Sequence, residues 1–256
     1  MATRLVTALS RGLRILGQLE KGPQSAPEIA TALSLPRATV HELLKTLEAE
    51  GFIRTEAGAA FALGMRLFEL GSAVERSLDI VQVGREHAQR VAAECGETVQ
   101  VALLDGTEIV YVAKVDSAHA VKLVSTVGAR LPAHLAAVGK ATLAYQPADE
   151  LDKLYPPDGP LAVLTPNSIS DARQLREALA EVRETGVAWD NCESNPDVRC
   201  VAAPVRDRRG AAIGGMSISV PTYRWDDALA DRLRGLVVSG AAALSADLGA
   251  AAGSPA

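Results

Sequence analysis

Residues 25–51 carry the pattern that most restricts the fold of this chain. Ser25 and Glu28 have the S-x-x-E spacing of a capping box, in which each residue satisfies a free backbone N–H of the other at the start of a helix. Pro36 lacks an N–H and therefore suits the first turn of a second helix, while Gly51 suits the end of that helix. The pattern predicts two short helices joined by a tight turn.

The second of these helices has an apolar face and a polar face. Four apolar residues recur at the i, i+3, i+4, i+7 spacing of one helix side, namely Val40, Leu43, Leu44 and Leu47. The other side and the helix start carry Arg37, Ala38, Thr39, His41, Glu42 and Lys45. A helix with one buried face and a polar N-terminal half suits the major groove of DNA. An ordinary helical hairpin with a solvated outer face would show the same pattern, so the flanking residues must decide.

The flanking residues favour a DNA-binding module. After Gly51, two short alternating segments surround a Gly-containing turn at 56–60, and they predict a β-hairpin. Before Ser25, regularly spaced leucines predict another helix, with Leu5, Leu9, Leu13, Leu16 and Leu19. Three helices and a hairpin within about sixty residues are typical of a winged helix-turn-helix. We therefore expect residues 1–64 to bind double-stranded DNA.

The side chains of this module suggest how it would contact DNA. Arg37 and Lys45 suit guanine or phosphate, and Thr39 suits a phosphate near the helix start. Glu42 repels phosphate but suits the amino group of cytosine. Arg54 and the turn at 56–60 are candidates for the DNA backbone or the minor groove.

The overall charge does not resemble that of a typical nucleic-acid-binding protein. The net charge is −5; residues 1–65 hold seven Lys or Arg against six Asp or Glu, net +1, and the remainder holds nineteen against twenty-five, net −6. Affinity for DNA would then depend on individually placed contacts and on dimerisation. Aromatic residues make up only 4% of the chain, which argues against a stacking surface for single strands.

The cysteine spacing and the hydropathy pattern bear on cofactors and compartment. Cys95, Cys192 and Cys200 lack CxxC spacing, so neither a disulfide framework nor a zinc site is expected. No apolar run approaches the roughly 20 residues of a membrane helix, and the N-terminus lacks the apolar segment of a secretory signal. We expect a cytoplasmic protein with no metal, no cofactor and no membrane contact.

Beyond residue 64, the sequence predicts a linker helix and an α+β domain. The linker helix covers 65–78, the second domain 79–250, and residues 251–256 form a frayed tail. Alternating apolar residues predict strands near 99–103, 109–113, 121–124, 187–190, 201–205 and 213–220. Helices are expected near 79–95, 136–144, 171–185 and 226–248. A mostly antiparallel sheet with helices at its ends and faces is typical of a sensor-like domain.

Four segments resemble the IclR family of bacterial transcriptional regulators. In the family's order they are LPRATVHELLKTLEAEGF, GETVQVALLDGTEIVYVAKVDS, VGARLPAHLAAVGKATLA and CVAAPVRDRRGAAIGGMSIS. The resemblance spans essentially the whole chain. It implies a winged helix-turn-helix, a linker helix and a C-terminal GAF-like domain that binds a small organic effector, in a homodimer or a dimer of dimers. Whether the regulator represses or activates stays open.

The resemblance also implies which residues bind the effector. The positions that match ligand contacts of the family are Ala137, Val138, Asp190, Cys200, Ser217 and Ser219, and apolar walls are expected from Leu123, Val127 and Leu131. Small residues at a helix start expose backbone N–H groups that suit a carboxylate or carbonyl oxygen. We therefore expect an effector with one of these groups, in a cavity with room for an aromatic ring.

A small-molecule hydrolase is the alternative function. Cys200, His134 and Asp190 are residue types that serve as nucleophile, base and orienting carboxylate. The chain has no G-x-S-x-G motif. Cys200 is equally compatible with a place in the core, and His134 with a structural hydrogen bond. We expect a regulator rather than an enzyme.

Overall fold

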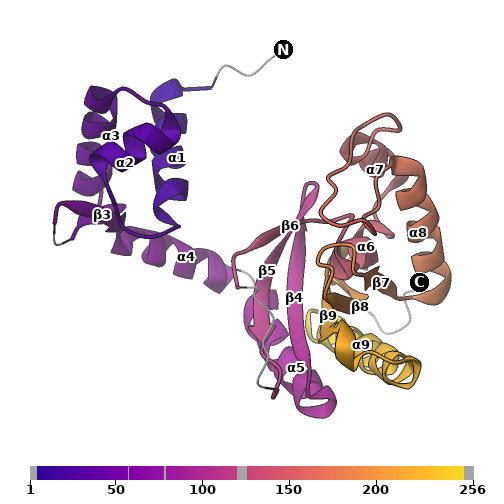
Figure 1. The fold of residues 1–256 in the computed structure, drawn as a ribbon. Coiled ribbons are helices and arrows are strands. Elements are labelled where there is room, and N and C mark those ends of the chain that lie inside the picture. Colours follow the sequence, from indigo (N-terminus) through magenta and orange to yellow (C-terminus); the bar gives the residue numbers. More distant parts are fainter. Residues whose placement is uncertain (1–4, 57, 78, 120–125, 251–256) are drawn as a thin grey trace. The chain divides into compact units, whose positions relative to one another are not determined.

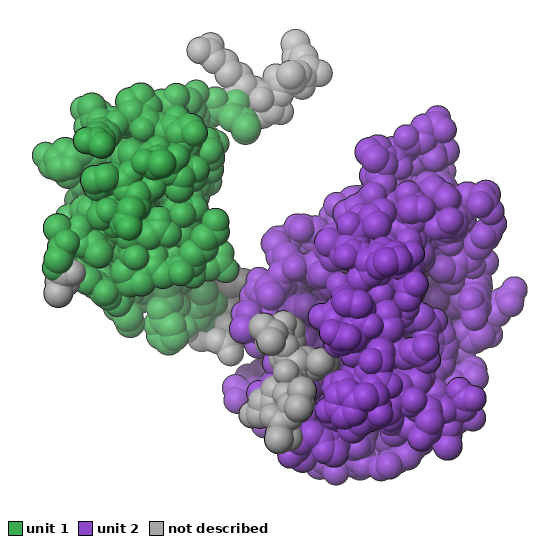
Figure 2. Space-filling view, viewed as in Figure 1, with its two compact units in different colours: residues 1–77 green, residues 78–256 purple. Residues whose placement is uncertain are grey.

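The computed structural model describes residues 5–56, 58–77, 79–119 and 126–250. They form two compact units, residues 1–77 and 78–256 (Figures 1 and 2). Helix α4 (Met65–Ser77), which corresponds to the predicted linker helix, clusters with the first unit. The predicted strand at 121–124, the predicted wall residue Leu123 and the predicted frayed tail at 251–256 lie outside the described residues.

The N-terminal unit contains the predicted helices and hairpin (Figure 1). Its helices are α1 (Thr7–Leu19), α2 (Ala26–Leu33) and α3 (Arg37–Ala49), and the hairpin consists of β2 (Ile53–Thr55) and β3 (Ala60–Leu63). A short strand, β1 (Gln24–Ser25), pairs with β3 and completes a three-stranded sheet in the order β1-β3-β2. Ile15, Ile29, Val40 and Leu44 are almost fully buried and hold the three helices together.

Local sequence signals set the helix boundaries of this unit. Ser25 and Glu28 form the predicted capping box, and the Ser25 N–H donates to Glu28 Oε2 over 2.7 Å. Gly51 has a φ of +74° and follows the last residue of α3 closely, as predicted. Pro36 stands just before α3 instead of within its first turn. The missing N–H has no cost at either position, because the first turn of a helix leaves its N–H groups without helical partners.

The apolar residues of α1 divide between the core and the surface. Ile15 and Leu19 are buried, whereas Leu9 and Leu13 are 64% and 59% exposed. Leu5, which precedes the helix, is 74% exposed. Leu5, Leu9 and Leu13 recur every four residues, and we call this exposed row the α1 leucine stripe.

The second unit is built on one six-stranded antiparallel sheet in the order β6-β5-β4-β9-β8-β7. The strands are β4 (Thr98–Asp105), β5 (Glu108–Val115), β6 (Arg130–Pro132), β7 (Ala188–Asn191), β8 (Val198–Arg206) and β9 (Ala212–Pro221). Helices α5 (Asp79–Cys95) and α9 (Asp227–Asp247) cover one face. Helices α6 (Ala137–Leu143), α7 (Ala148–Leu154) and α8 (Ala172–Thr185) gather on the other, and a 3₁₀ turn, η1 (Thr222–Arg224), joins β9 to α9 (Figure 1). The predicted α+β class is confirmed.

Residue alternation gives the two faces of this sheet different chemistry. On β9, Met216 and Ile218 belong to the core beneath α5 and α9, so Ser217 and Ser219 point to the face that carries α6. On β8, Val201 packs into the same core as Met216, and Cys200 faces the α6 side. Because side chains alternate with a period of two, the polar residues of neighbouring strands gather on the α6 face.

Candidate functional site

The polar face of α3 lies at the surface of the N-terminal unit. Arg37, Ala38, His41, Glu42 and Lys45 are exposed, and Thr39 is half-buried. On the opposite face, Val40 and Leu44 are 0% and 1% exposed, which fixes the helix on its core. The predicted DNA-contacting residues of α3 therefore share one accessible surface.

Arg54 is exposed, but its guanidinium is engaged within the hairpin. One guanidinium nitrogen donates to Leu63 O over 2.6 Å, and another pairs with Glu56 over 2.7 Å. The guanidinium has five N–H donors, so it can still donate a hydrogen bond to a further acceptor. A DNA phosphate at Arg54 would nevertheless compete with the Glu56 carboxylate.

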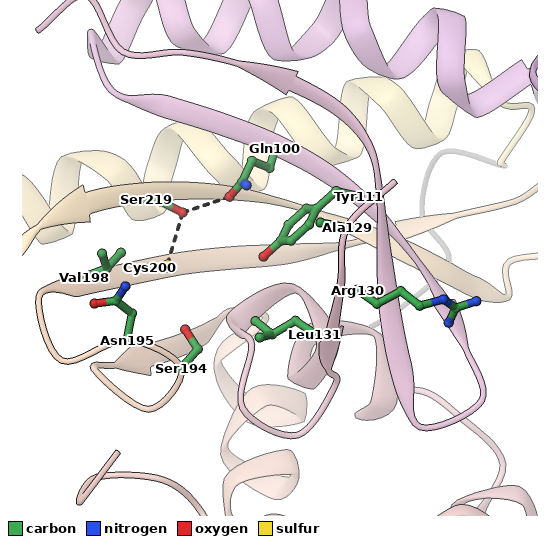
Figure 3. A pocket seen from close by; sticks show the side chains of 10 residues that line it. All are labelled: Gln100, Tyr111, Ala129, Arg130, Leu131, Ser194, Asn195, Val198, Cys200 and Ser219. Carbon is green, nitrogen blue, oxygen red and sulfur yellow. Dashed lines mark hydrogen bonds between the residues drawn. The ribbon is translucent and has the colours of Figure 1, made fainter. Parts of the chain in front are cut away.

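A pocket of about 200 Å³ opens on the α6 face of the second unit (Figure 3). Strands β4, β5, β6, β8 and β9 and the loop between β7 and β8 supply its walls. The residues that line it are Gln100, Tyr111, Ala129, Arg130, Leu131, Ser194, Asn195, Val198, Cys200 and Ser219.

Strand register places polar residues side by side at this pocket. Asp190 on β7 is opposite Cys200 on β8, and Cys200 is opposite Ser219 on β9. Cys200 Sγ lies 3.1 Å from Ser219 Oγ, which donates to Gln100 Oε1 over 3.2 Å (Figure 3). A polar row therefore crosses three strands and continues onto β4.

Asp190 is almost fully buried and holds the loop between β7 and β8. Its carboxylate accepts hydrogen bonds from the Glu193 N–H over 2.6 Å and from Ser194 Oγ over 2.5 Å. Burial raises the pKa of Asp190 from 3.8 to about 6, although these two hydrogen bonds act in the opposite direction. The two hydrogen bonds thus hold the ionised carboxylate in place, while burial deprives it of contact with water.

A buried ion pair fixes the same loop to α6. Lys140 Nζ lies 2.5 Å from both carboxylate oxygens of Glu193, and the two side chains are 4% and 9% exposed. Thr165 Oγ1 donates to Cys192 O over 2.7 Å, and Cys192 has a φ of +63°. Removing either charge would leave the other buried without its partner. The ion pair therefore holds the loop that carries Ser194 and Asn195 against α6.

The structure describes eight of the nine predicted effector contacts, and these eight fall into four groups. Leu131, Cys200 and Ser219 line the pocket. Asp190 supports its wall through Ser194, and the buried Ser217 is opposite Gln100 in the strand register. Ala137 and Val138 are each 2% exposed in the core around α6, a core that Tyr111, Leu131 and Cys200 also border. Val127 is 60% exposed and does not line the pocket, and Leu123 lies outside the described residues.

Several lining residues were not predicted, among them Gln100, Tyr111, Ser194 and Asn195. Gln100 interrupts the apolar run VQVALL, which is a sequence signal for a polar side chain on the inner face of a strand. Ser194 and Asn195 have no such signal, because their position depends on the path of the loop between β7 and β8.

Cys200, His134 and Asp190 do not assemble as a catalytic set. His134 Nε2 lies 3.0 Å from Ala162 O, and His134 is not among the residues that line the pocket. Burial raises the pKa of the Cys200 thiol, which therefore stays uncharged and is a poor nucleophile. The geometry does not support the hydrolase alternative.

The residues that the structure describes offer neither a metal site nor a membrane-spanning helix. In that part of the chain, no group of three or more His, Cys, Asp or Glu residues could hold a metal ion. No described helix combines the length and the apolar character needed to cross a membrane.

Both units match models of one protein family. Residues 8–57 match the IclR helix-turn-helix domain, and residues 72–246 match the C-terminal domain of the bacterial transcriptional regulator IclR. The chain belongs to the IclR family. IclR-family proteins are transcriptional regulators and not enzymes, so the N-terminal domain binds DNA and the GAF-like C-terminal domain binds a small effector.

Individual relatives agree with this assignment. The HTH-type transcriptional regulator XynR of Escherichia coli K12 is 33% identical over 249 residues, which cover 96% of this chain and 98% of XynR. The crystal structure of Thermotoga maritima IclR has 30% identity and a TM-score of 0.77, covering 94% and 98% of the two chains. An IclR homologue from Microbacterium hydrocarbonoxydans, solved with 4-hydroxybenzoate, has 24% identity and a TM-score of 0.82, covering 94% and 99%, and shares the fold.

Proposed function

We propose that an effector bound in the pocket of the second unit changes the affinity of α3 for an operator, and that α4 transmits the change. The observation that carries this proposal is the pocket itself, where Leu131, Cys200 and Ser219 meet at a polar row buried within the sensor domain. An effector changes DNA affinity only if it binds two arrangements of the protein with different strength. Helix α4 directly follows the hairpin of the DNA-binding domain and directly precedes the second unit in sequence.

The DNA contacts belong to the polar face of α3. Arg37 and Lys45 bind guanine or phosphate, and Thr39 binds a phosphate at the helix start. Ala38, His41 and Glu42 lie against base edges, and Glu42 favours cytosine at its position. Arg54 supports the hairpin and contacts the DNA backbone. The exposure of these side chains, with the opposite face of α3 buried, supports the assignment.

The effector carries a carboxylate or carbonyl group, and a single ring fits the space. An engineered cavity of roughly 150 Å³ in another protein accommodates benzene, so a pocket of about 200 Å³ accepts one ring with small substituents. Leu131, Cys200 and Ser219 contact this effector, with Asp190 and Ser217 behind them. The family resemblance is the support for four further effector contacts. They are the apolar wall residues Leu123 and Val127 and the contacts Ala137 and Val138 at the start of α6.

The protein acts in the cytoplasm as a homodimer or a dimer of dimers. The α1 leucine stripe supports pairing between two copies of the DNA-binding domain, because a row of exposed leucines is stabilised by burial against a second apolar surface. Pairing would also join two α3 helices for two half-sites of an operator.

A DNA-binding titration tests the proposal. Purified protein is titrated against labelled DNA from the region upstream of its own gene, with and without a panel of small acids, phenols and amides. We expect sequence-specific binding whose affinity one class of compound changes. Binding without sequence preference that no compound alters would overturn the proposal.

A further inference from the structure

Two hydrogen-bond donors in the pocket have no protein partner within the described part of the chain. One is the Tyr111 hydroxyl; the other is the Asn195 side-chain N–H₂. Asn195 Oδ1 accepts the Asp197 N–H over 2.9 Å, which orients the amide and leaves its nitrogen for other partners. Tyr111 on β5 and Asn195 in the loop between β7 and β8 reach the pocket from different sides (Figure 3).

The hydroxyl of Tyr111 is a donor over the whole physiological pH range. Burial raises the pKa of Tyr111, and the neighbouring Cys200 and Asp190 act in the same direction, so the hydroxyl keeps its proton. Two other polar groups of the pocket are already engaged. Ser194 Oγ donates to Asp190, and Ser219 Oγ donates to Gln100. Tyr111 and Asn195 are therefore the donors that a ligand can use without breaking a protein hydrogen bond.

The charges around the pocket disfavour an anionic ligand. The Arg130 side chain extends away from the pocket centre in Figure 3, and it pairs with Asp105 and Glu108. Lys140 is buried against Glu193. Asp190 adds a buried negative charge directly behind Ser194. An anion entering this site would lose hydration without gaining an uncommitted cation among the described residues.

We propose that Tyr111 and Asn195 form a donor pair that selects a ring-sized effector through an uncharged acceptor, such as an amide or ketone carbonyl, over the matching carboxylate. This inference rests on the proposed function of the pocket as the effector site. The carbonyl oxygen accepts from both donors, and the apolar part of the ligand lies against Ala129, Leu131 and Val198.

Two contacts that hold the loop between β7 and β8 strengthen this selection. Asn195 follows two anchored residues, since Glu193 pairs with Lys140 and Ser194 donates to Asp190. A donor that is already oriented loses little conformational entropy when a ligand binds. A ligand whose acceptor lies elsewhere binds more weakly, because the anchored loop cannot move Asn195 toward it.

Matched pairs of compounds test the selection. Calorimetry at pH 8 compares benzamide with benzoate and butyramide with butyrate, so that each pair differs mainly in charge. We expect benzamide to bind at least about tenfold more tightly than benzoate, because the carboxylate loses the hydration of a full charge without gaining an uncommitted cation among the described residues. The aliphatic pair should keep the same preference with weaker affinity. Equal or tighter binding of the carboxylates, or no binding of either amide, would overturn the proposal.

Two variants test whether the named donors are responsible. Tyr111→Phe removes only the hydroxyl, and Asn195→Asp removes the N–H₂ group while keeping an acceptor for the Asp197 N–H. Each should weaken benzamide binding about tenfold with an unchanged melting temperature. Tyr223→Phe, at an exposed tyrosine of η1 outside the pocket, is the matched control and should bind benzamide like the wild type. Unchanged benzamide affinity in both pocket variants would contradict the donor pair.

The DNA titration separates this inference from the proposed function. If carboxylates alter operator binding and amides do not, the effector mechanism stands and the selection by Tyr111 and Asn195 is wrong. If benzamide binds with the expected variant pattern but no compound alters DNA binding, the ligand site stands and the proposed regulation is wrong.

Discussion

Asp190 combines a buried carboxylate with a supporting role in the pocket wall, and this makes the stability of the second unit depend on pH. The pKa is about 6 in the folded chain against 3.8 for the free side chain. Between these values the folded state binds more protons than the unfolded state, so stability falls as the pH rises through this window. Above pH 6 the loss from this group reaches about 3 kcal/mol.

Asp190→Asn should remove this pH dependence. The amide can still accept from the Glu193 N–H and can donate to Ser194 Oγ, so the loop keeps its hydrogen bonds. Urea unfolding should show the variant gaining stability over the wild type between pH 4.5 and pH 7.5. Asp158→Asn, at an exposed carboxylate in the loop after α7, is the control and should follow the wild type at both pH values. A variant-to-wild-type difference that is the same at both pH values would contradict the assignment.

The place of a single residue was predictable where strand alternation, or a match to a ligand-contacting position of the family, indicates which face of the sheet it lies on. Ser219 and Cys200 are examples, since both were expected at the effector site and both line the pocket. Asn195 and Ser194 were not predictable, because their placement depends on Glu193 reaching Lys140, which is 53 positions earlier in the chain. Tyr111 lies where the pairing of β4 with β5 shifts register near Val101 and Ala102, and sequence alternation does not indicate such a shift.

At the level of elements, α6 is the helix whose position depends most clearly on a glycine. A methyl group added at Gly139 would lie 2.0 Å from the carbonyl oxygen of Ala133, so α6 would have to move away from the preceding chain. Gly139→Ala should therefore destabilise the second unit by about 1–3 kcal/mol. Gly235→Ala in α9 is the matched control, because nothing lies within 4 Å of the added methyl group. Thermal unfolding of the control should show unchanged or higher stability, by up to about 1 kcal/mol.

The exposed face of helix α3 is the proposed DNA-binding surface, whereas its buried face stabilises the N-terminal unit. Arg37→Ala should lower operator affinity about tenfold and leave the melting temperature unchanged, because Arg37 is exposed. Val40→Ala, three residues further along α3 at a fully buried side chain, should instead destabilise the N-terminal unit by roughly 1–3 kcal/mol. Gel-shift assays and thermal unfolding of both variants check this contrast. Unchanged DNA affinity in Arg37→Ala would remove Arg37 from the proposed contacts.

Most elements were predictable because their ends carry local signals. Asp105-Gly106 marks the β4–β5 turn, with a φ of +62° at Gly106, and Asp171 caps α8 by accepting the Gln174 N–H. The strand order was not predictable from such signals. Strand β9 lies between β4 and β8, and the pairing of Thr98 with Ser219 joins residues far apart in the sequence. Long-range pairing of this kind depends on the packing of the whole sheet.

For the whole molecule, the α1 leucine stripe makes a prediction about assembly. Replacing Leu9 and Leu13 together by Gln should lower the molar mass measured by light scattering, because the change removes apolar surface but no core contact. Operator affinity should fall with it, since paired half-sites need paired domains. Val163→Gln with Leu164→Gln, at two exposed apolar residues of the second unit, is the control and should keep the wild-type mass. A double Leu variant of unchanged mass would place the interface elsewhere.

The engagement of Arg54 by Glu56 has a further consequence for how the regulator responds to ionic strength. Each phosphate neutralised by a cation releases counterions and adds roughly 0.9 to the slope of log affinity against log salt concentration. Arg37 and Lys45 are the Lys/Arg residues of α3, and Glu56 already balances the charge of Arg54 where Arg54 contacts the DNA backbone. These contacts would therefore contribute a slope of only about 2 per protomer. Operator binding should therefore survive increases in intracellular salt that would dissociate a strongly basic repressor.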